Sequence, residues 1–274
     1  MIKHTALLVL CAYIVMPGVG FSQGTYFKAG GSYRLGLPSM LIGTNYTSTS
    51  SSTGSTSKSE GVYGTLGKGL GFEGAIGYKG ENLGIEVGVS YLLKSSIETT
   101  NIYNSNSSVS STTSTYESSM MAINPSLVFA TDVGFYGRAG AVLGFPKFAS
   151  KRYSESPGSP TGIEDQTTKY SGNMALGLMG ALGVAVGSGA VRLYVEVDVV
   201  SLTWAPASSE ITEYTVNGKD QLPSMKVYDK KTNFEETTTT NSSIPQNMDV
   251  PRVSLKDYIP FSSVGLKAGV MLGF

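Results

Sequence analysis

The residues with the clearest potential for chemistry are charged side chains that stand singly among glycine, small and apolar residues. They are Lys28, Arg34, Glu73, Glu86, Arg138, Arg192, Glu196, Asp198 and Lys267. The two signs are nearly balanced, so these side chains could pair in one network of ion pairs and hydrogen bonds inside the protein. They could instead line a narrow pore, with Arg192 and Glu196 flanking a constriction. An isolated buried ion costs several kcal/mol, and the paired network is therefore the expected arrangement.

Enzymatic chemistry is not expected from these residues. Glu196 and Asp198 could suggest acid and base catalysis, but two carboxylates inside a filled interior would have no access to a substrate. The sole histidine, His4, and the sole cysteine, Cys11, lie in an N-terminal segment that we expect to be cleaved. Without them, histidine-dependent nucleophilic mechanisms and zinc or copper sites lack their usual side chains. We therefore predict no enzyme, no catalytic residue, no cofactor and no metal site.

An export signal is predicted at the N-terminus. Lys3 and His4 give a short polar start, residues 6–16 are apolar, and Pro17 introduces a break before Ser22. The alternative, a retained transmembrane helix, needs roughly 20 apolar residues, whereas this run has only about a dozen. We predict a signal peptide over residues 1–22 and one barrel domain over residues 23–274.

Segments with a two-residue alternation follow, as expected of strands with two different faces. In the clearest of them, valine and leucine occupy the odd positions from 191 to 199, and Arg192, Tyr194, Glu196 and Asp198 occupy the even ones. The segments are residues 26–37, 70–78, 83–93, 121–129, 135–145, 174–186, 191–199 and 264–274. Short turns alternate with long polar connections between them, which is typical of transmembrane barrels. The predicted fold is all-β, an antiparallel up-and-down transmembrane β-barrel of about eight strands.

The long polar connections are predicted to be four extracellular loops. They cover residues 38–69, 95–118, 149–169 and 205–257. Two contain nearly pure serine and threonine tracts, which cannot form a packed core. In the last loop, Asn217-Gly218 predicts a hairpin turn that stands above the membrane. If that hairpin entered the wall instead, the barrel would gain two strands.

The apolar rows are predicted to face lipid, and the small and charged rows to face the lumen. The interior of such a small barrel only just accommodates side chains, so bulky rows turned inward would overfill it. Replacing Val195 by Arg should therefore block assembly, whereas Tyr194→Ser should be tolerated far better. Aromatic belts are expected at both interfaces. They are Phe27, Tyr78, Phe129, Phe135 and Phe274 at the periplasmic level, and Tyr91, Phe145, Tyr170, Trp204 and Tyr258 at the outer level.

The last predicted strand ends on an aromatic residue. With Leu266, Val270 and Leu272 at alternating apolar positions and Phe274 as the final residue, it resembles the C-terminal signal by which the barrel assembly machinery recognises its clients. With the strand pattern, nearly all of the chain after the predicted signal resembles the small outer-membrane β-barrel proteins, the group of the OmpA barrel domain and the OmpX-like proteins. The long serine and threonine loops are reminiscent of barrel proteins from Bacteroidetes-type bacteria.

This resemblance implies a non-enzymatic, monomeric protein of the outer membrane of a Gram-negative bacterium, with a structural or surface-interaction role and a plugged lumen. The implied partners are outer-membrane lipid and lipopolysaccharide, the barrel assembly machinery during biogenesis, and a surface ligand bound through the loops. The alternative function is a small pore or diffusion channel for small or apolar solutes. The balance of 20 acidic and 20 basic residues gives no footprint for nucleic acid.

Overall fold

A computed structural model of the chain describes residues 24–37, 40–80, 83–105, 108–131, 134–157, 162–187, 190–238 and 247–273. Within these residues, sixteen strands form one mostly antiparallel sheet. The helical residues there are two short segments, η1 (Leu222–Ser224) and α2 (Val227–Lys230). No helix in this part of the chain is long and apolar enough to cross a membrane. The predicted signal peptide lies outside the described residues.

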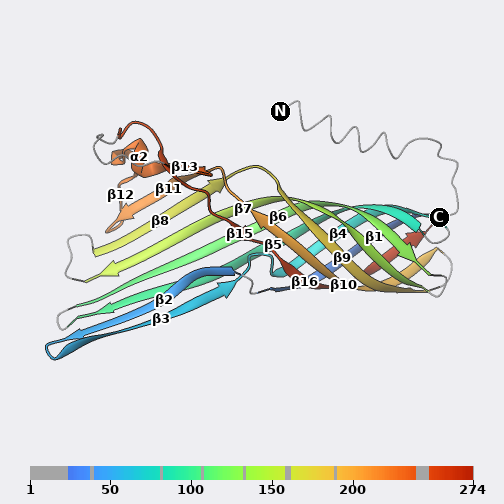
Figure 1. The fold of residues 1–274 in the computed structure, drawn as a ribbon, viewed down its shortest axis with the longest axis horizontal. Coiled ribbons are helices and arrows are strands. Elements are labelled where there is room, and N and C mark those ends of the chain that lie inside the picture. Colours follow the sequence, from blue (N-terminus) through green and yellow to red (C-terminus); the bar gives the residue numbers. More distant parts are fainter. Residues whose placement is uncertain are drawn as a thin grey trace.

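Eight of the described strands pair one after another around a closed circuit, which we call the barrel (Figure 1). In circuit order they are β1 (Thr25–Gly36), β4 (Gly69–Lys79), β5 (Leu83–Asn104), β6 (Val109–Ala130), β7 (Phe135–Ser156), β9 (Ala175–Val186), β10 (Val191–Trp204) and β16 (Ser263–Gly273). Each strand is antiparallel to the next. The circuit closes where β16 pairs with β1, from Tyr26 opposite Gly273 to Gly36 opposite Ser263.

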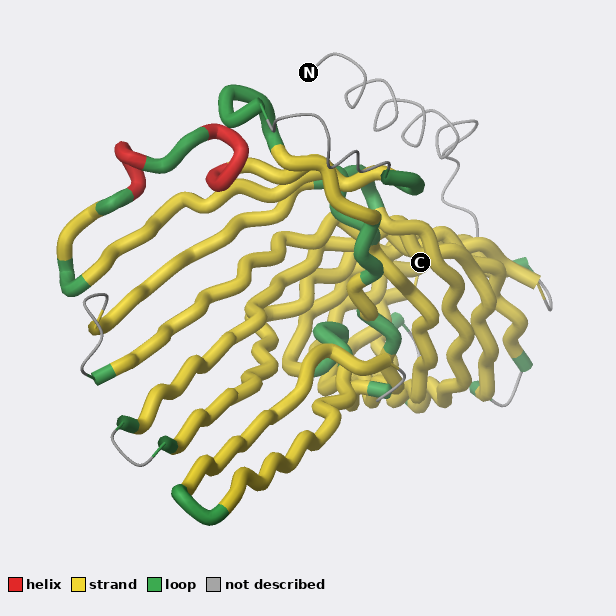
Figure 2. Tube along the Cα trace, turned by 60° about the vertical axis from the view of Figure 1, so that its left-hand side comes forward, coloured by secondary structure: helices red, strands yellow, loops and turns green. Residues whose placement is uncertain are grey.

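A second region, which we call the projecting sheet, extends from one end of the barrel. It contains the outer halves of β5, β6 and β7 together with β2 (Met40–Ser51), β3 (Gly54–Gly64), β8 (Gly162–Ser171), β11 (Ser208–Val216), β12 (Lys219–Asp220), β13 (Lys231–Glu235) and β14 (Arg252–Leu255). β5, β6 and β7 have 22 residues each, which is roughly 70 Å of extended chain. Figure 2 shows the strands fanning apart beyond the barrel.

The strands diverge where β7 changes its partner. Residues 135–144 of β7 pair with β9, and residues 148–156 pair with β8. At the same level, β5 has a bulge between Leu92 and Ser95. A bulge bends its strand and increases the local twist. The closed barrel therefore gives way to an open sheet at this level.

The prediction of about eight strands counts too few, because much of the four predicted loops also forms strands. Residues 40–64 contain the β2–β3 hairpin, and the serine and threonine tract from residue 109 onward continues β6. Threonine is β-branched and favours extended backbone. These tracts can therefore pair with neighbouring strands without forming a packed core.

The predicted hairpin at Asn217-Gly218 is confirmed. The two residues lie between β11 and β12 and have φ angles of 49° and 75°. Positive φ at both central residues is what a two-residue hairpin turn of this type requires. The hairpin does not enter the barrel, because β11 pairs with β8 in the projecting sheet.

Large apolar side chains cover the outside of the barrel, as the alternation predicts. Along β10, the odd positions from Val191 to Val199 are between 47% and 60% exposed, whereas Tyr194, Glu196 and Asp198 are buried. The predicted periplasmic aromatics Phe27, Tyr78, Phe129 and Phe135 are exposed as well. The predicted assignment of the two faces is confirmed for residues 193–199 of this strand, and it places Glu196 and Asp198 inside.

Candidate functional site

The interior charged residues come from strands that are far apart in sequence. Register sets Lys267 of β16 opposite Glu196 of β10. It also sets Gly30 of β1 opposite Glu73 of β4. Lys28 is two residues before Gly30 and therefore on the same face of β1, so its inward side chain lies next to that carboxylate. Because successive side chains in a strand point to opposite faces, a few inward positions on neighbouring strands gather in a small volume.

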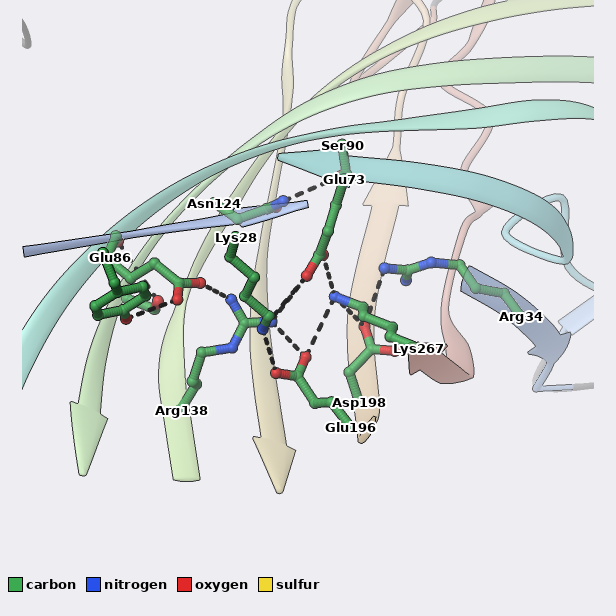
Figure 3. Close-up of polar contacts among 12 residues, drawn as sticks. Lys28, Arg34, Glu73, Glu86, Ser90, Asn124, Arg138, Glu196, Asp198 and Lys267 are labelled. Atoms are coloured by element: carbon green, nitrogen blue, oxygen red, sulfur yellow. Dashed lines mark hydrogen bonds and ion pairs between the residues drawn. The ribbon is translucent and has the colours of Figure 1, made fainter. Parts of the chain in front are cut away.

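Two carboxylates, those of Glu73 and Glu196, lie at the centre of this volume (Figure 3). Lys28 Nζ lies 2.7 Å from Glu196 Oε2 and 3.5 Å from Glu73 Oε1. Lys267 Nζ lies 2.5 Å from Glu73 Oε2 and 3.5 Å from Glu196 Oε1. Arg138 Nη2 pairs with Glu196 and lies 3.6 Å from Glu73 Oε1. Each of the two carboxylates therefore faces the same three cations.

Two further contacts extend the cluster toward opposite sides. Arg138 pairs through Nη1 with Glu86, whose Oε2 also accepts a 2.8 Å hydrogen bond from the Tyr26 hydroxyl. On the other side, Arg34 Nη2 lies 2.9 Å from Asp198 Oδ2. We call the charge network the set of Lys28, Arg34, Glu73, Glu86, Arg138, Glu196, Asp198 and Lys267. It contains four cations and four carboxylates, and no side chain in it is more than 11% exposed.

The charge network gathers every predicted lumen residue except Arg192. Arg192 is the second residue of β10 and is exposed, and among the described residues it has no ion-pair partner. Four residues of extended strand separate it from Glu196, which is roughly 13 Å. The prediction that these two residues flank a constriction is therefore wrong. Its even position in the alternation predicted an inward side chain, but the alternation does not indicate how near to the strand end Arg192 lies.

Three tyrosines complete the charged interior, although they were not among the predicted site residues. They are Tyr26, Tyr136 and Tyr194, and each is less than 9% exposed. Lys28 Nζ lies 4.3 Å from the ring centroid of Tyr194 and 5.3 Å from that of Tyr136, within the range of cation–π attraction. Each tyrosine lies two positions before a member of the charge network, so the alternation along its strand could have predicted that it faces inward. Tyr194→Ser would remove a buried ring, so we expect it to be less well tolerated than the sequence suggested.

A cluster of buried apolar side chains, many of them large, fills the interior toward the projecting sheet, and we call it the apolar cap. Its members are Leu66, Leu92, Ile97, Met120, Ala122, Val142, Phe148, Ala175, Met179, Ala181, Val200, Leu202, Trp204, Ile259 and Phe261. The prediction that the inside holds mainly small residues is wrong at this level, because the strands diverge and leave room for larger ones. Trp204, predicted at the outer lipid interface, is 2% exposed in the cap, and its Nε1 donates to the Asn173 carbonyl at 2.7 Å.

Two connecting segments enter this end of the barrel and hold the apolar cap. One is residues 65–68, and the other contains the short strand β15 (Ile259–Pro260), which pairs with β10. The Leu66 amide donates to the Pro260 carbonyl at 3.0 Å, and the Phe261 amide donates to the Leu202 carbonyl at 2.9 Å. A Cβ at Gly67 would lie 2.0 Å from the Phe261 carbonyl oxygen. Only glycine permits so close an approach of the two segments.

A void of about 10 Å³ lies between the charge network and the apolar cap. Ser32, Arg34 and Asn124 line it from one side, and Met120 and Val142 from the other. A single water needs about 10–15 Å³ of this kind of space. The void is therefore large enough for about one water molecule.

The predicted assembly residues of β16 face outward. Leu266, Val270 and Leu272 are 56%, 38% and 41% exposed, and Phe274 lies outside the described residues. Their role as an assembly signal stays a prediction.

The chemistry of the interior is electrostatic cross-linking of strands. Each carboxylate of the charge network is within 4.0 Å of at least one lysine or arginine. In the described part of the chain, no group of three histidine, cysteine, aspartate or glutamate side chains could hold a metal ion. The buried groups thus connect β1, β4, β5, β7, β10 and β16.

Comparisons with known proteins identify no family for this chain. No family model matches it, and neither does a curated protein. Among solved structures, the crystal structure of Neisserial surface protein A is similar, with 17% sequence identity and a TM-score of 0.30. The match covers 92% of this chain and 97% of that chain. A similarity of this degree establishes neither family nor function.

Proposed function

We propose that this chain is a non-enzymatic integral β-barrel protein of the outer membrane of a Gram-negative bacterium. Eight strands span the membrane, the lumen is plugged, and the role is structural or one of surface interaction. The observation that carries the proposal is the inverted polarity of the barrel: ions and tyrosines are buried at its centre, while leucine, valine and aromatic side chains cover its outside. The hydrocarbon of a bilayer can cover such a surface, whereas soluble proteins rarely expose large apolar patches to water.

The exposed apolar surface continues around the whole circuit, which supports a membrane-spanning wall. One member from each strand of the circuit is Tyr33, Phe72, Ile85, Leu127, Phe135, Leu182, Val195 and Leu266, and these are between 48% and 74% exposed. Closure matters as well, since a barrel leaves no unpaired backbone edge to face hydrocarbon.

The filled interior supports a plug over a pore. The charge network occupies one half of the barrel and the apolar cap the other, and the void that both line has a volume of about 10 Å³. Leu66 and Phe261 are packed into the interior at this end and are 1% and 0% exposed, which supports an interior closed to hydrated ions. A small diffusion channel is therefore the less favoured function.

The projecting sheet supports a role at the cell surface. Its edge strand β3 is almost entirely polar and exposed. Among the described strands, β3 pairs with β2 alone, so its other edge is open. An exposed edge offers unpaired backbone groups to which an extended partner segment can add as a further strand. The sheet is therefore a candidate surface for the ligand that the sequence assigned to the loops.

Export and assembly belong to the same proposal. A cleaved signal peptide over residues 1–22 delivers the chain, the barrel assembly machinery inserts it, and lipid and lipopolysaccharide surround the monomer. Cleavage would also remove His4 and Cys11, which supports a role without nucleophilic or metal-dependent catalysis.

Cell fractionation with heat-modifiable gel mobility tests the location and the fold together. The protein is expected in the outer-membrane fraction, and boiled and unboiled samples are expected to migrate differently because a barrel resists unfolding in detergent. A soluble protein with one mobility would overturn the proposal.

Planar-bilayer recording tests the plug. The refolded wild-type protein is expected to give no stable conductance steps. Reproducible single-channel steps from protein that also shows heat-modifiable mobility would replace the plug by a pore and leave the membrane barrel intact.

A further inference from the structure

A groove opens on the outward face where the barrel meets the projecting sheet. It crosses β5, β6, β7 and β8, and its volume is about 820 Å³. Its charged lining residues are Lys94, Glu117, Lys147 and Lys169, and we call it the basic groove. The divergence of the strands at this level makes the outer surface concave here.

The strand irregularities of this level place the lysines on the outward face. In the bulge of β5, Leu93 and Lys94 are both exposed, whereas regular alternation would turn one of them inward. Lys147 lies on β7 where that strand leaves β9 for β8, and Lys169 of β8 lies opposite Ala149. Three lysines from β5, β7 and β8 thus lie on the outward face at the level where β7 changes its partner.

The basic groove carries positive charge in excess. Glu117 is its acidic member, and its carboxylate is already engaged by Lys94 Nζ at 2.8 Å and Lys151 Nζ at 3.2 Å. Those contacts, led by the hydrogen bond from Lys94, lower the pKa of Glu117, so it remains ionised. Within the described chain, Lys147 and Lys169 have no ion-pair partner and are exposed. These two ammonium groups are therefore available to an anion.

An apolar row borders the basic groove on the side of the barrel. Register aligns Tyr91 of β5, Met121 of β6 and Phe145 of β7 side by side. Tyr91 and Met121 are 44% and 45% exposed on the outward face. The lysines therefore stand directly beyond the apolar band, at the level where lipid headgroups would meet the protein.

We propose that the basic groove binds the phosphate-bearing headgroup of a membrane lipid whose acyl chains lie along Tyr91, Met121 and Phe145. This inference rests on the proposed membrane location. Lysine ammonium groups bind phosphate as point charges, and basic residues next to a membrane surface attract anionic lipids. The apolar row selects a lipid over a free phosphate, because the acyl chains gain contact with it while the headgroup reaches the lysines.

Native mass spectrometry of the refolded full chain in uncharged detergent tests the proposal with short-chain phosphatidic acid as the probe. Wild-type protein is expected to retain phosphatidic acid in preference to phosphatidylcholine. The triple variant Lys94→Gln, Lys147→Gln and Lys169→Gln is expected to bind it at least about tenfold more weakly. The matched control changes Lys58, Lys219 and Lys226 to Gln and is expected to bind like wild type. These three lysines are exposed away from the basic groove, on β3, on β12 and next to α2.

The other results each overturn the inference. If the groove variant binds phosphatidic acid as tightly as wild type, or if the control variant loses as much binding as the groove variant, the basic groove is not the binding site. Inorganic phosphate that binds as tightly as phosphatidic acid would show a phosphate site without lipid selection. Heat-modifiable mobility of every sample separates these results from failure of the membrane barrel itself, which would already appear in the wild-type protein.

Discussion

The two halves of the barrel interior are filled in opposite ways. The charge network is built from strand residues and holds four cations against four carboxylates. The apolar cap depends on two connecting segments that enter the barrel and bury Leu66 and Phe261. One half joins strands by charge, and the other closes the barrel by packing.

The difference teaches which property each half controls. A shift of one residue in register would turn a strand's charges toward the outside of the barrel, so the charge network penalises wrong strand pairing. The contacts of the apolar cap are non-directional, so they discriminate between registers less strongly than the ion pairs do. We expect the charge network to govern correct assembly and the apolar cap to govern closure and stability.

The largest effect is expected from Glu196→Leu. This change leaves Lys28, Lys267 and Arg138 without one of their two shared carboxylates, and it should cost about 3–5 kcal/mol of unfolding free energy. Urea titration in phosphatidylcholine vesicles measures it. The double variant Glu196→Leu with Lys28→Leu restores the charge balance and should recover part of the loss. Strictly additive losses would contradict the coupling.

Leu66→Ala tests the apolar cap by packing alone. The cavity should cost about 2–5 kcal/mol. The single tryptophan, Trp204, lies in the same cluster, so its fluorescence in the folded state should shift, whereas Glu196→Leu should leave it unchanged. Leu255→Ala, at a residue that is 60% exposed on β14, serves as the control. If the Trp204 spectrum is unchanged in Leu66→Ala, Leu66 and Trp204 do not pack in one cluster.

Val195→Arg moves a charge to the outside of the barrel, opposite in location to the charge network. At mid-bilayer it should cost about 2–4 kcal/mol. The fraction of heat-modifiable protein after refolding measures it, and Val195→Leu should refold like wild type. If the arginine variant refolds equally well, this face does not contact hydrocarbon.

The smallest effect is expected outside the barrel, at Glu117→Gln. The Glu117 pKa is lowered by Lys94 and Lys151, so its ion pairs stabilise the fold above the ordinary carboxyl value of about 4.3 and are lost as pH falls through the lower folded pKa. At this partly exposed site the gain should stay under about 1 kcal/mol. Urea titrations of wild type and variant should differ at neutral pH and converge in acid. A constant difference would point to a cause other than ionisation.

Much of the barrel could be predicted from sequence because its signal is local. Alternation along each predicted strand, clearest in residues 191–199, indicated which side chains face outward, and it placed Lys28, Glu73 and Glu196 inside. The same alternation applies to Tyr26, Tyr136 and Tyr194, but only Tyr194 was predicted on the inward face, and none of the three was counted among the site residues. The strands of the projecting sheet were missed for another reason: serine and threonine tracts show no apolar alternation, and their pairing depends on neighbours.

The sequence by itself determined the two-faced strands, the Asn217-Gly218 turn and the identity of the paired charges, because each is set by residue type within a few positions. Only the tertiary structure decided that Arg192 lies outside the charge network, that Trp204 and Phe261 close the interior, and that three lysines meet on one outward groove. These depend on register, on bulges and on the path of connecting segments. Such long-range geometry joins residues that no local pattern relates.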